Sequence, residues 1–160
     1  MSGFLDGILS FGVQAAYAGI TGTKKAKKAA EVYSRLVSED EQVSAGEFME
    51  MYDLRSYDFN NKSNDIKFMK TVDFQGVYMI HNADKNKYLV GKGKEVFRKI
   101  SRHFRGYGNN ALYEDYKAGD RVFVRAIKYD ENKHGNIEKL EQEIAARYSS
   151  YTSGYNRAGI

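Results

Sequence analysis

One short segment of the chain concentrates positive charge in a way that could hold phosphate groups. Between residues 92 and 105, six Lys or Arg residues stand against one acid, Glu95, which gives a net charge of +5. The six are Lys92, Lys94, Arg98, Lys99, Arg102 and Arg105. Clustered cations of this kind bind nucleic-acid phosphates without reading the base sequence. The segment therefore predicts a DNA-binding surface, and a solvated amphipathic helix is the alternative.

The composition excludes several other kinds of chemistry. The chain has no Cys, so it has no disulfide framework, no thiolate metal site and no Cys nucleophile. Its three His residues make a multi-histidine zinc site hard to build. Residues 1–70 carry nine Lys/Arg and ten Asp/Glu, whereas residues 71–160 carry sixteen and eleven. The positive excess of the second part again favours an anionic partner.

The elements that would position this segment form a small mixed domain. Two β-rich runs at 76–81 and 87–91 flank a stretch of turn formers, which predicts a β-hairpin. A third strand is expected at 121–127. Helical spacing of apolar residues predicts helices at 94–104, 111–117 and 136–148. The expected fold is α/β, of the α+β kind, with a small three-stranded sheet flanked by helices.

Residues 1–70 are expected to form a separate helical region. Apolar residues recur at helical spacing over 23–37, and Ser44 with Glu47 has the spacing of a capping box that opens a further helix. The polar run 60–64 is typical of a linker and places a domain boundary within residues 60–70. We therefore expect two domains, 1–70 and 71–160.

The apolar segment 4–20 is the most hydrophobic part of that region. It is about one transmembrane length, but it contains Asp6 and Gln14, and a Lys cluster follows it rather than precedes it. That order is wrong for a signal peptide, so we expect a cytoplasmic, intracellular protein. The N-terminal helices are expected to bind a protein partner or a second copy of the chain, with a membrane contact of 4–20 as the less favoured alternative.

Several ordered motifs within residues 74–157 resemble the GIY-YIG nuclease domain family. Gly76-Val77-Tyr78, a turn and then Leu89-Val90-Gly91 are similar to its signature. The resemblance continues through His103, the segments 106–109 and 112–117, Leu140-Glu141 and Gly154-Tyr155-Asn156. It implies a compact α/β domain with a central three-stranded antiparallel sheet, which hydrolyses phosphodiesters with one divalent metal ion.

The resemblance also implies roles for individual residues. Glu141 stands at the metal-binding glutamate of the family, and one carboxylate with water ligands suits Mg²⁺ or Mn²⁺. Tyr78 matches the first signature tyrosine and would activate or orient water, or it could simply be a strand tyrosine packed on the sheet. Tyrosine is a poor base at its ordinary pKa of about 10, and Lys92 would supply the cation that its phenolate needs.

Three further residues complete the expected catalytic set. His103 follows Lys99 by four residues, so both project from one helix face, where His103 could relay a proton, donate to a phosphate or cap the helix. Asn156 would hold a backbone or phosphate oxygen, or form a turn. The expected catalytic residues are Tyr78, Lys92, Lys99, His103, Glu141 and Asn156.

Two positions depart from the family pattern. Leu89 stands where the second signature tyrosine is expected. Tyr88 faces the opposite side of the strand, so it cannot replace the missing hydroxyl unless the register slips or a bulge forms. Lys99 stands in place of an arginine and lacks its forked grip on phosphate oxygens. Because loss of one charge-stabilising donor can cost about 3 kcal/mol of barrier, activity is expected to be weakened.

Taken together, the sequence predicts a Mg²⁺- or Mn²⁺-dependent DNA endonuclease with weakened activity. The alternatives are a catalytically inactive DNA- or protein-binding module of the same fold, and a phage, mobile-element or toxin-type effector whose apolar N-terminus engages a partner or a membrane. The residues expected to contact DNA are Lys94, Arg98, Arg102 and Arg105.

Overall fold

A four-stranded antiparallel sheet with strand order β1-β6-β4-β5 lies at the centre of the protein. The structure, a computed structural model, describes residues 23–39, 41–53, 55–58, 63–67, 72–150 and 153–156, so the apolar segment 4–20 and its expected contacts lie outside the described residues. The three expected strands are present, and the mixed α/β fold is confirmed. The fourth strand is a two-residue addition at one edge. The strands are β1 (Val43–Ser44), β4 (Gly76–Asn82), β5 (Lys87–Gly93) and β6 (Val122–Lys128).

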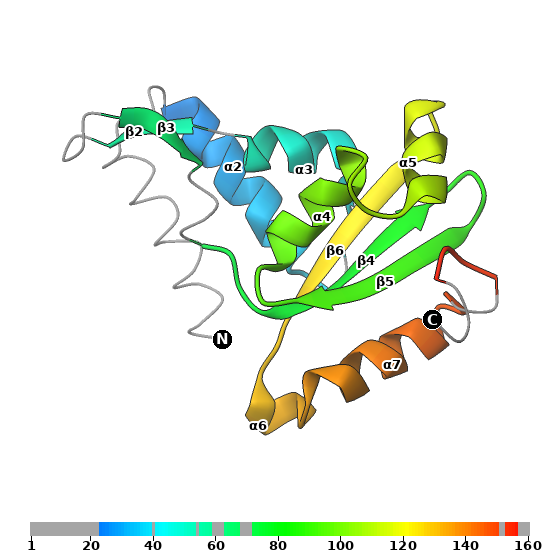
Figure 1. Ribbon diagram of the computed structural model, residues 1–160. Coiled ribbons are helices and arrows are strands. Elements are labelled where there is room, and N and C mark those ends of the chain that lie inside the picture. The colour runs from blue at the N-terminus through cyan, green and yellow to red at the C-terminus, as the bar shows by residue number, and fades with distance from the viewer. Residues whose placement is uncertain are drawn as a thin grey trace.

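Helices cover both faces of this sheet (Figure 1). One face carries α2 (Thr23–Leu36), α3 (Ala45–Tyr52), α4 (Val96–Phe104) and α5 (Asn110–Lys117). The other face carries α6 (Glu131–His134) and α7 (Ile137–Arg147). No helix within the described residues is long and apolar enough to cross a membrane.

The strand register sorts side chains between the two faces. On β4 and β5, Tyr78 lies opposite Gly91 and Ile80 lies opposite Leu89. Because successive residues of a strand face opposite sides, these side chains point toward α2–α4, while the intervening Val90 points toward α7. The two faces therefore have separate hydrophobic clusters. Alternate residues along each strand belong to alternate clusters.

The N-terminal helices share the larger of these clusters with the sheet. Val32 of α2 and Phe48 of α3 pack in the same core as Tyr78 and Phe97, and β1 pairs with β6. A hairpin of β2 (Arg55–Asp58) and β3 (Ser63–Lys67) stands where helical structure and a linker were expected. The division into domains 1–70 and 71–160 stays a prediction. Among the described residues, α2 and α3 bury their apolar faces against the sheet.

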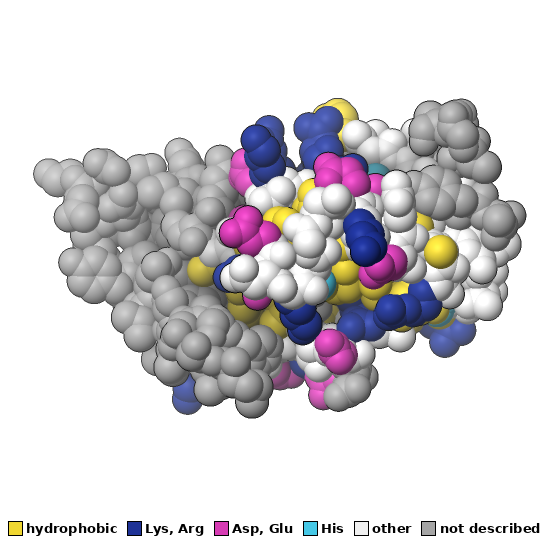
Figure 2. All heavy atoms as spheres, turned by 90° about the horizontal axis from the view of Figure 1, so that it is seen from below, with side chains coloured by type: hydrophobic (Ala, Val, Ile, Leu, Met, Phe, Trp, Pro, Cys, Tyr) yellow, Lys and Arg dark blue, Asp and Glu magenta, His cyan; other side chains and the backbone are white. Residues whose placement is uncertain are grey.

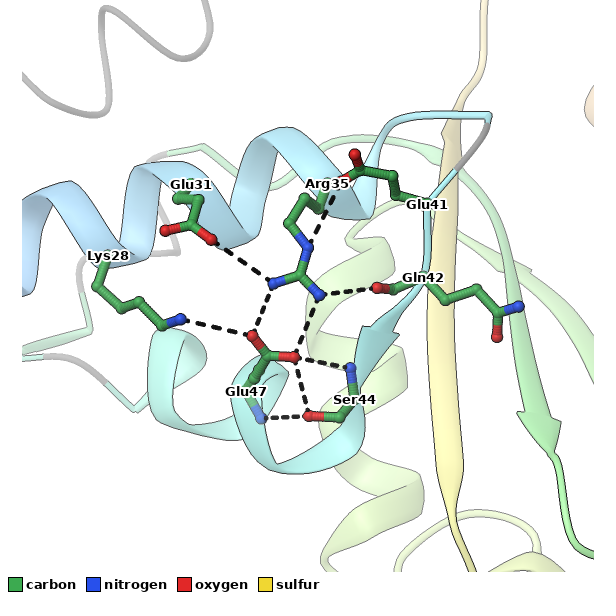
Figure 3. Close-up of polar contacts among 7 residues, drawn as sticks. All are labelled: Lys28, Glu31, Arg35, Glu41, Gln42, Ser44 and Glu47. Atoms are coloured by element: carbon green, nitrogen blue, oxygen red, sulfur yellow. Dashed lines mark hydrogen bonds and ion pairs between the residues drawn. The ribbon is translucent and has the colours of Figure 1, made fainter.

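A charged network fixes α2 to the start of α3 (Figure 3). The Arg35 guanidinium donates to Glu47 Oε2 at 2.7 Å and to the Gln42 carbonyl at 3.0 Å. Glu47 also completes the predicted capping box, since the Ser44 side chain accepts from its N–H and its carboxylate accepts from the Ser44 N–H. Hydrogen bonding from Arg35, opposed by burial and reinforced by the Ser44 backbone, holds the pKa of Glu47 at about 2.

Replacing Glu47 with glutamine should lower the free energy of unfolding by about 1–2 kcal/mol at pH 7, because the charge-assisted bond to Arg35 is lost while the cap is kept. A carboxyl group with a lowered pKa stabilises the fold above its ordinary pKa of 4.5 and loses that effect as the pH falls toward 2. Urea titrations should show the difference from wild type shrinking below pH 4.5. Glu50→Gln, at an exposed position of the same helix, should behave like wild type at every pH; a gap of constant size would contradict the assignment.

Candidate active site

Tyr78 lies in the middle of β4 and reaches across the neighbouring strand. Its side chain is buried, and its residue pairs with Gly91 of β5. The phenol lies so close to Gly91 that a Cβ at that position would overlap the Tyr78 hydroxyl and ring. A glycine inside a strand often marks this kind of close approach. Gly91 thus provides the space in which the Tyr78 hydroxyl lies over β5, the last strand of the sheet.

His103 of α4 holds the Tyr78 hydroxyl. Its Nε2 is 2.8 Å from Tyr78 Oη, and its Nδ1 accepts the backbone N–H of Asn109 at 2.8 Å. A backbone N–H can only donate, so in the neutral imidazole Nδ1 carries the lone pair and Nε2 carries the proton. This hydrogen-bond network therefore assigns His103 as a donor to the Tyr78 oxygen, which leaves the phenol proton free for another acceptor.

Burial, together with the nearby charges, keeps both groups of this pair neutral. Burial, followed by the nearby cations Lys99 and Arg102, lowers the pKa of His103 to about 4. Burial, followed by the negative charge of Glu141, raises the pKa of Tyr78 well above its ordinary value. At pH 7 the pair is therefore an uncharged imidazole and an uncharged phenol. Forming a Tyr78 phenolate would require additional positive charge beside it.

Glu141 and Lys92 form an ion pair on the opposite face of the sheet. Asn136 is the N-cap of α7 and its side chain accepts the Lys139 N–H, while Leu140 anchors the helix in the smaller hydrophobic cluster. The Glu141 carboxylate, with 18% of its side chain exposed, lies 3.4 Å from Lys92 Nζ. Lys92 directly follows Gly91, so strand alternation turns it away from Tyr78. The structure thus pairs Lys92 with Glu141, where the prediction placed it as the cation for Tyr78.

Asn156 binds the backbone of β5. Its Oδ1 accepts the Val90 N–H and its Nδ2 donates to the Val90 carbonyl, both at 2.9 Å. Next to it, the Tyr155 N–H donates to the Tyr88 carbonyl at 2.9 Å. Of the predicted alternatives for Asn156, the structure shows the contact with backbone, and both functional groups of its amide are used in it.

All six residues of the predicted catalytic set gather around one stretch of β5, Val90–Gly93. Tyr78 crosses Gly91, and the aliphatic stem of Lys99 lies 2.8 Å from where a Cβ on Gly93 would stand. The ion pair of Glu141 is made to Lys92, and Asn156 is bonded to Val90. Within the described part of the chain, the exposed side chain of Lys99 makes no salt bridge. This stretch is the candidate active site.

Leu89, one of the two positions that depart from the expected pattern, has a structural consequence here. Leu89 is 5% exposed and packs in the larger core, on the same face as Tyr78. Tyr88 faces the other way and stacks on His81, with ring centroids 4.1 Å apart. No bulge brings the Tyr88 hydroxyl to the face of Tyr78, because the β4–β5 register is regular from end to end. The site therefore contains the Tyr78 hydroxyl without a second tyrosine hydroxyl from position 88 or 89 on its face of the sheet.

The residues present fit a hard divalent cation held by few protein ligands. No group of three or more His, Asp or Glu side chains gathers among the described residues. Mg²⁺ commonly binds through one or two carboxylates and keeps several water ligands. Glu141 supplies such a carboxylate, partly exposed and with only one of its oxygens paired to Lys92. A cation at this position would be held by Glu141, in competition with the Lys92 ammonium group.

The four residues expected to contact DNA differ in their surroundings. Lys94 and Arg102 are exposed and form no salt bridge with another described residue. Arg98 lies 3.8 Å from Glu95, at an exposed pair that contributes little. Arg105 is paired with Asp53 at the end of α3 and lies over the Tyr52 ring. Lys94 and Arg102 are therefore the most available cations of this group.

A large groove lies beside α6 and α7. It has a volume of about 1180 Å³ and is lined mainly by β6, α6 and α7, with further residues such as Tyr33 of α2 and Met79 of β4. Its cations Arg125, Lys128, Lys133 and Arg147 are matched in number by its acids Glu39, Asp130, Glu131 and Glu143. Figure 2 shows this side of the molecule, with Lys/Arg and Asp/Glu side chains interspersed around apolar ones. Its balanced charge gives this groove no general attraction for phosphates.

Two residues of the site were not singled out from the sequence. The Asn109 N–H fixes the imidazole of His103, while its side chain accepts the Leu112 N–H as the N-cap of α5. Gly108 lies against the imidazole so closely that a Cβ there would overlap it. An Asn directly before a helix is a recognisable N-cap signal. A Gly directly before that Asn allows another side chain to approach the backbone closely. Their contact with His103 depends on the tertiary fold.

Comparison with solved structures finds a similarity to the catalytic domain of intron endonuclease I-TevI, determined as a point mutant. The two chains are 24% identical over an alignment that covers 54% of this chain and 95% of that chain, with a TM-score of 0.41. No family model and no curated protein matches the chain.

Proposed function

We propose that the protein is a divalent-metal-dependent endonuclease that hydrolyses phosphodiester bonds in DNA, in the manner of the GIY-YIG family. The observation that carries the proposal is the convergence of Tyr78–His103 and Glu141–Lys92 on the same stretch of β5 from opposite faces. A phenol, a carboxylate and nearby ammonium groups are the groups that metal-assisted phosphodiester hydrolysis requires. The exposed cations of α4 lie on the same side as Tyr78.

Each residue then has a chemical task. His103 donates to Tyr78 Oη and so orients the phenol, whose own proton can reach a water molecule or a phosphate oxygen. Lys99 provides positive charge for a non-bridging phosphate oxygen. Glu141 holds the divalent ion, with Lys92 balancing its charge when the ion is absent. That ion, when bound, polarises the phosphate and adds positive charge near Tyr78.

A catalytically inactive DNA- or protein-binding module is the second candidate. Two observations favour it: a leucine fills the place of the second signature tyrosine and packs in the core, and Lys99 cannot grip phosphate through two parallel bonds. Both changes remove groups that stabilise charge in the transition state while leaving the fold intact. In this form the protein would keep its affinity for DNA and lose turnover.

A nicking assay on supercoiled plasmid separates the two candidates. The full chain should convert supercoiled to open-circular DNA in Mg²⁺ or Mn²⁺, and an excess of EDTA should abolish the reaction because Glu141 then holds no ion. A gel-shift measurement in EDTA reports DNA binding independently of cleavage. DNA binding with no nicking in either metal would reject the endonuclease and support the binding module. Nicking that is unaffected by EDTA would also overturn the proposal.

A further inference from the structure

Tyr107 presents an aromatic ring to solvent in the turn between α4 and α5. The residue is 72% exposed, and no other large apolar side chain within the described residues is exposed to solvent in this way. Its position is defined by the backbone, because its N–H donates to the Arg102 carbonyl at 2.9 Å and Gly106 adopts φ 87°. The ring is therefore held outward by a structured turn.

This turn also forms one wall of the candidate active site. Gly108, the next residue, lies against the His103 imidazole, and the N–H of Asn109 binds its Nδ1. A nucleic acid whose scissile phosphate reaches Tyr78 would consequently pass close to Tyr107. The His103 imidazole connects the two, because its Nδ1 accepts from this turn and its Nε2 lies 2.8 Å from Tyr78 Oη.

Tyr107 differs from the two neighbouring tyrosines in the exposure of its ring. Tyr113 packs against Gly106 and lies under Lys117, and Tyr116 packs on Phe104 with ring centroids 4.9 Å apart. The Tyr107 ring is 72% exposed, and the Arg102 guanidinium lies over it, with its Cζ 6.0 Å from the ring centroid. Of the three rings, Tyr107 is the one available to a ligand, and it has an exposed cation next to it.

A phenol ring beside a guanidinium group suits a nucleotide whose base is unstacked. The cation can bind the phosphate while the ring stacks on the base, a combination typical of sites for single-stranded nucleic acid. In a continuous duplex the bases are stacked on each other and present only their edges in the grooves. Tyr107 therefore gains a stacking partner only where a base is unpaired.

We propose that Tyr107 and Arg102 bind an unpaired nucleotide next to the scissile phosphate, so that DNA with unpaired bases, such as the segments that open locally in a supercoiled plasmid, is bound in preference to fully paired duplex. The choice of the scissile phosphate rests on the proposed function, whereas the stacking itself does not. Arg102 holds the phosphate of that nucleotide, and Tyr107 covers its base. This assignment places the preference for single-stranded over double-stranded DNA in the α4–α5 turn.

The test measures binding in EDTA, where no cleavage occurs. The probes are a fluorescein-labelled single-stranded oligonucleotide, the same strand annealed to its full complement, and the strand with one 2-aminopurine. Tyr107→Ala should weaken single-stranded binding about tenfold and change duplex binding less than about twofold, because stacking is lost and phosphate contacts remain. Tyr107→Phe keeps an aromatic ring, so it should bind single-stranded DNA with wild-type affinity. It should also quench the fluorescence of the 2-aminopurine strand as wild type does.

Lys94→Ala is the matched control. It removes an exposed cation of the same surface and should weaken both probes by similar factors, with a shallower salt dependence. Equal losses for the two probes in Tyr107→Ala, or no loss in either, would overturn the inference. If wild type fails to nick plasmid but the tenfold effect is found, the endonuclease proposal fails and the nucleotide site stands. If wild type nicks and Tyr107→Ala keeps wild-type affinity for both probes, only the nucleotide site fails.

Discussion

Replacing Glu141 with glutamine should reduce metal-dependent nicking about a thousandfold, which corresponds to about 4 kcal/mol of transition-state stabilisation. The amide keeps the size of the side chain but has no negative charge with which to hold a divalent ion. The substitution also leaves Lys92 without its partner at 3.4 Å. We expect nicking to be lost at all accessible Mg²⁺ concentrations, and DNA binding in EDTA to stay within about twofold of wild type.

Glu143→Gln provides the control for this prediction. Glu143 lies on the same helix, is exposed, and is not in contact with Lys92, so its loss changes the helix charge by the same amount without touching the site. The nicking rate of Glu143→Gln should match wild type. Equal rates for the two variants, measured on supercoiled plasmid, would place the metal ion at some group other than Glu141.

Replacing Gly91 with alanine should disable the site through Tyr78. The added Cβ would overlap the Tyr78 hydroxyl, so the ring must move and its 2.8 Å contact with His103 must break. We expect about 1–3 kcal/mol of lost stability from overpacking, and at least about a hundredfold loss of nicking because the phenol is misplaced. Thermal unfolding and the nicking rate measure the two effects separately.

Gly46→Ala is a suitable comparison, because a Cβ at Gly46 of α3 meets nothing within 4 Å. Alanine is the better helix former, so this variant should be as stable as wild type or more stable, with unchanged nicking. A Gly91→Ala protein that nicks at the wild-type rate would show that the position of the Tyr78 phenol does not matter for the reaction.

Much of the fold could be predicted because its signals are local. The hairpin of β4 and β5 follows from two β-rich runs around a turn, in which Asn86 adopts a positive φ of 51°. The apolar residues of α4, spaced at helical intervals, are buried as expected, and the capping box of Ser44 and Glu47 forms. Each of these features depends on residues that are close together in the chain.

The arrangement of the site depends on contacts between distant residues. Tyr78 and His103 are 25 residues apart, and Lys92 is 49 residues from Glu141. Sequence spacing does not reveal which face of the sheet α7 covers. The face that α7 covers determines that Glu141 pairs with Lys92. The domain boundary at residues 60–70 stays a prediction from a polar run, and the packing of α2 on the sheet depends on tertiary contacts that composition does not report.

The amide of Asn156 has a consequence for the behaviour of the whole molecule. Its two bonds to Val90 reproduce the pattern that a neighbouring strand would make, and the Tyr155 N–H adds a third bond at Tyr88. Exposed strand edges are templates on which other chains can pair and aggregate. By occupying the outer edge of β5, this short segment makes the strand beside the reacting groups unavailable to another β-strand, so the same contacts that shape the site also favour solubility.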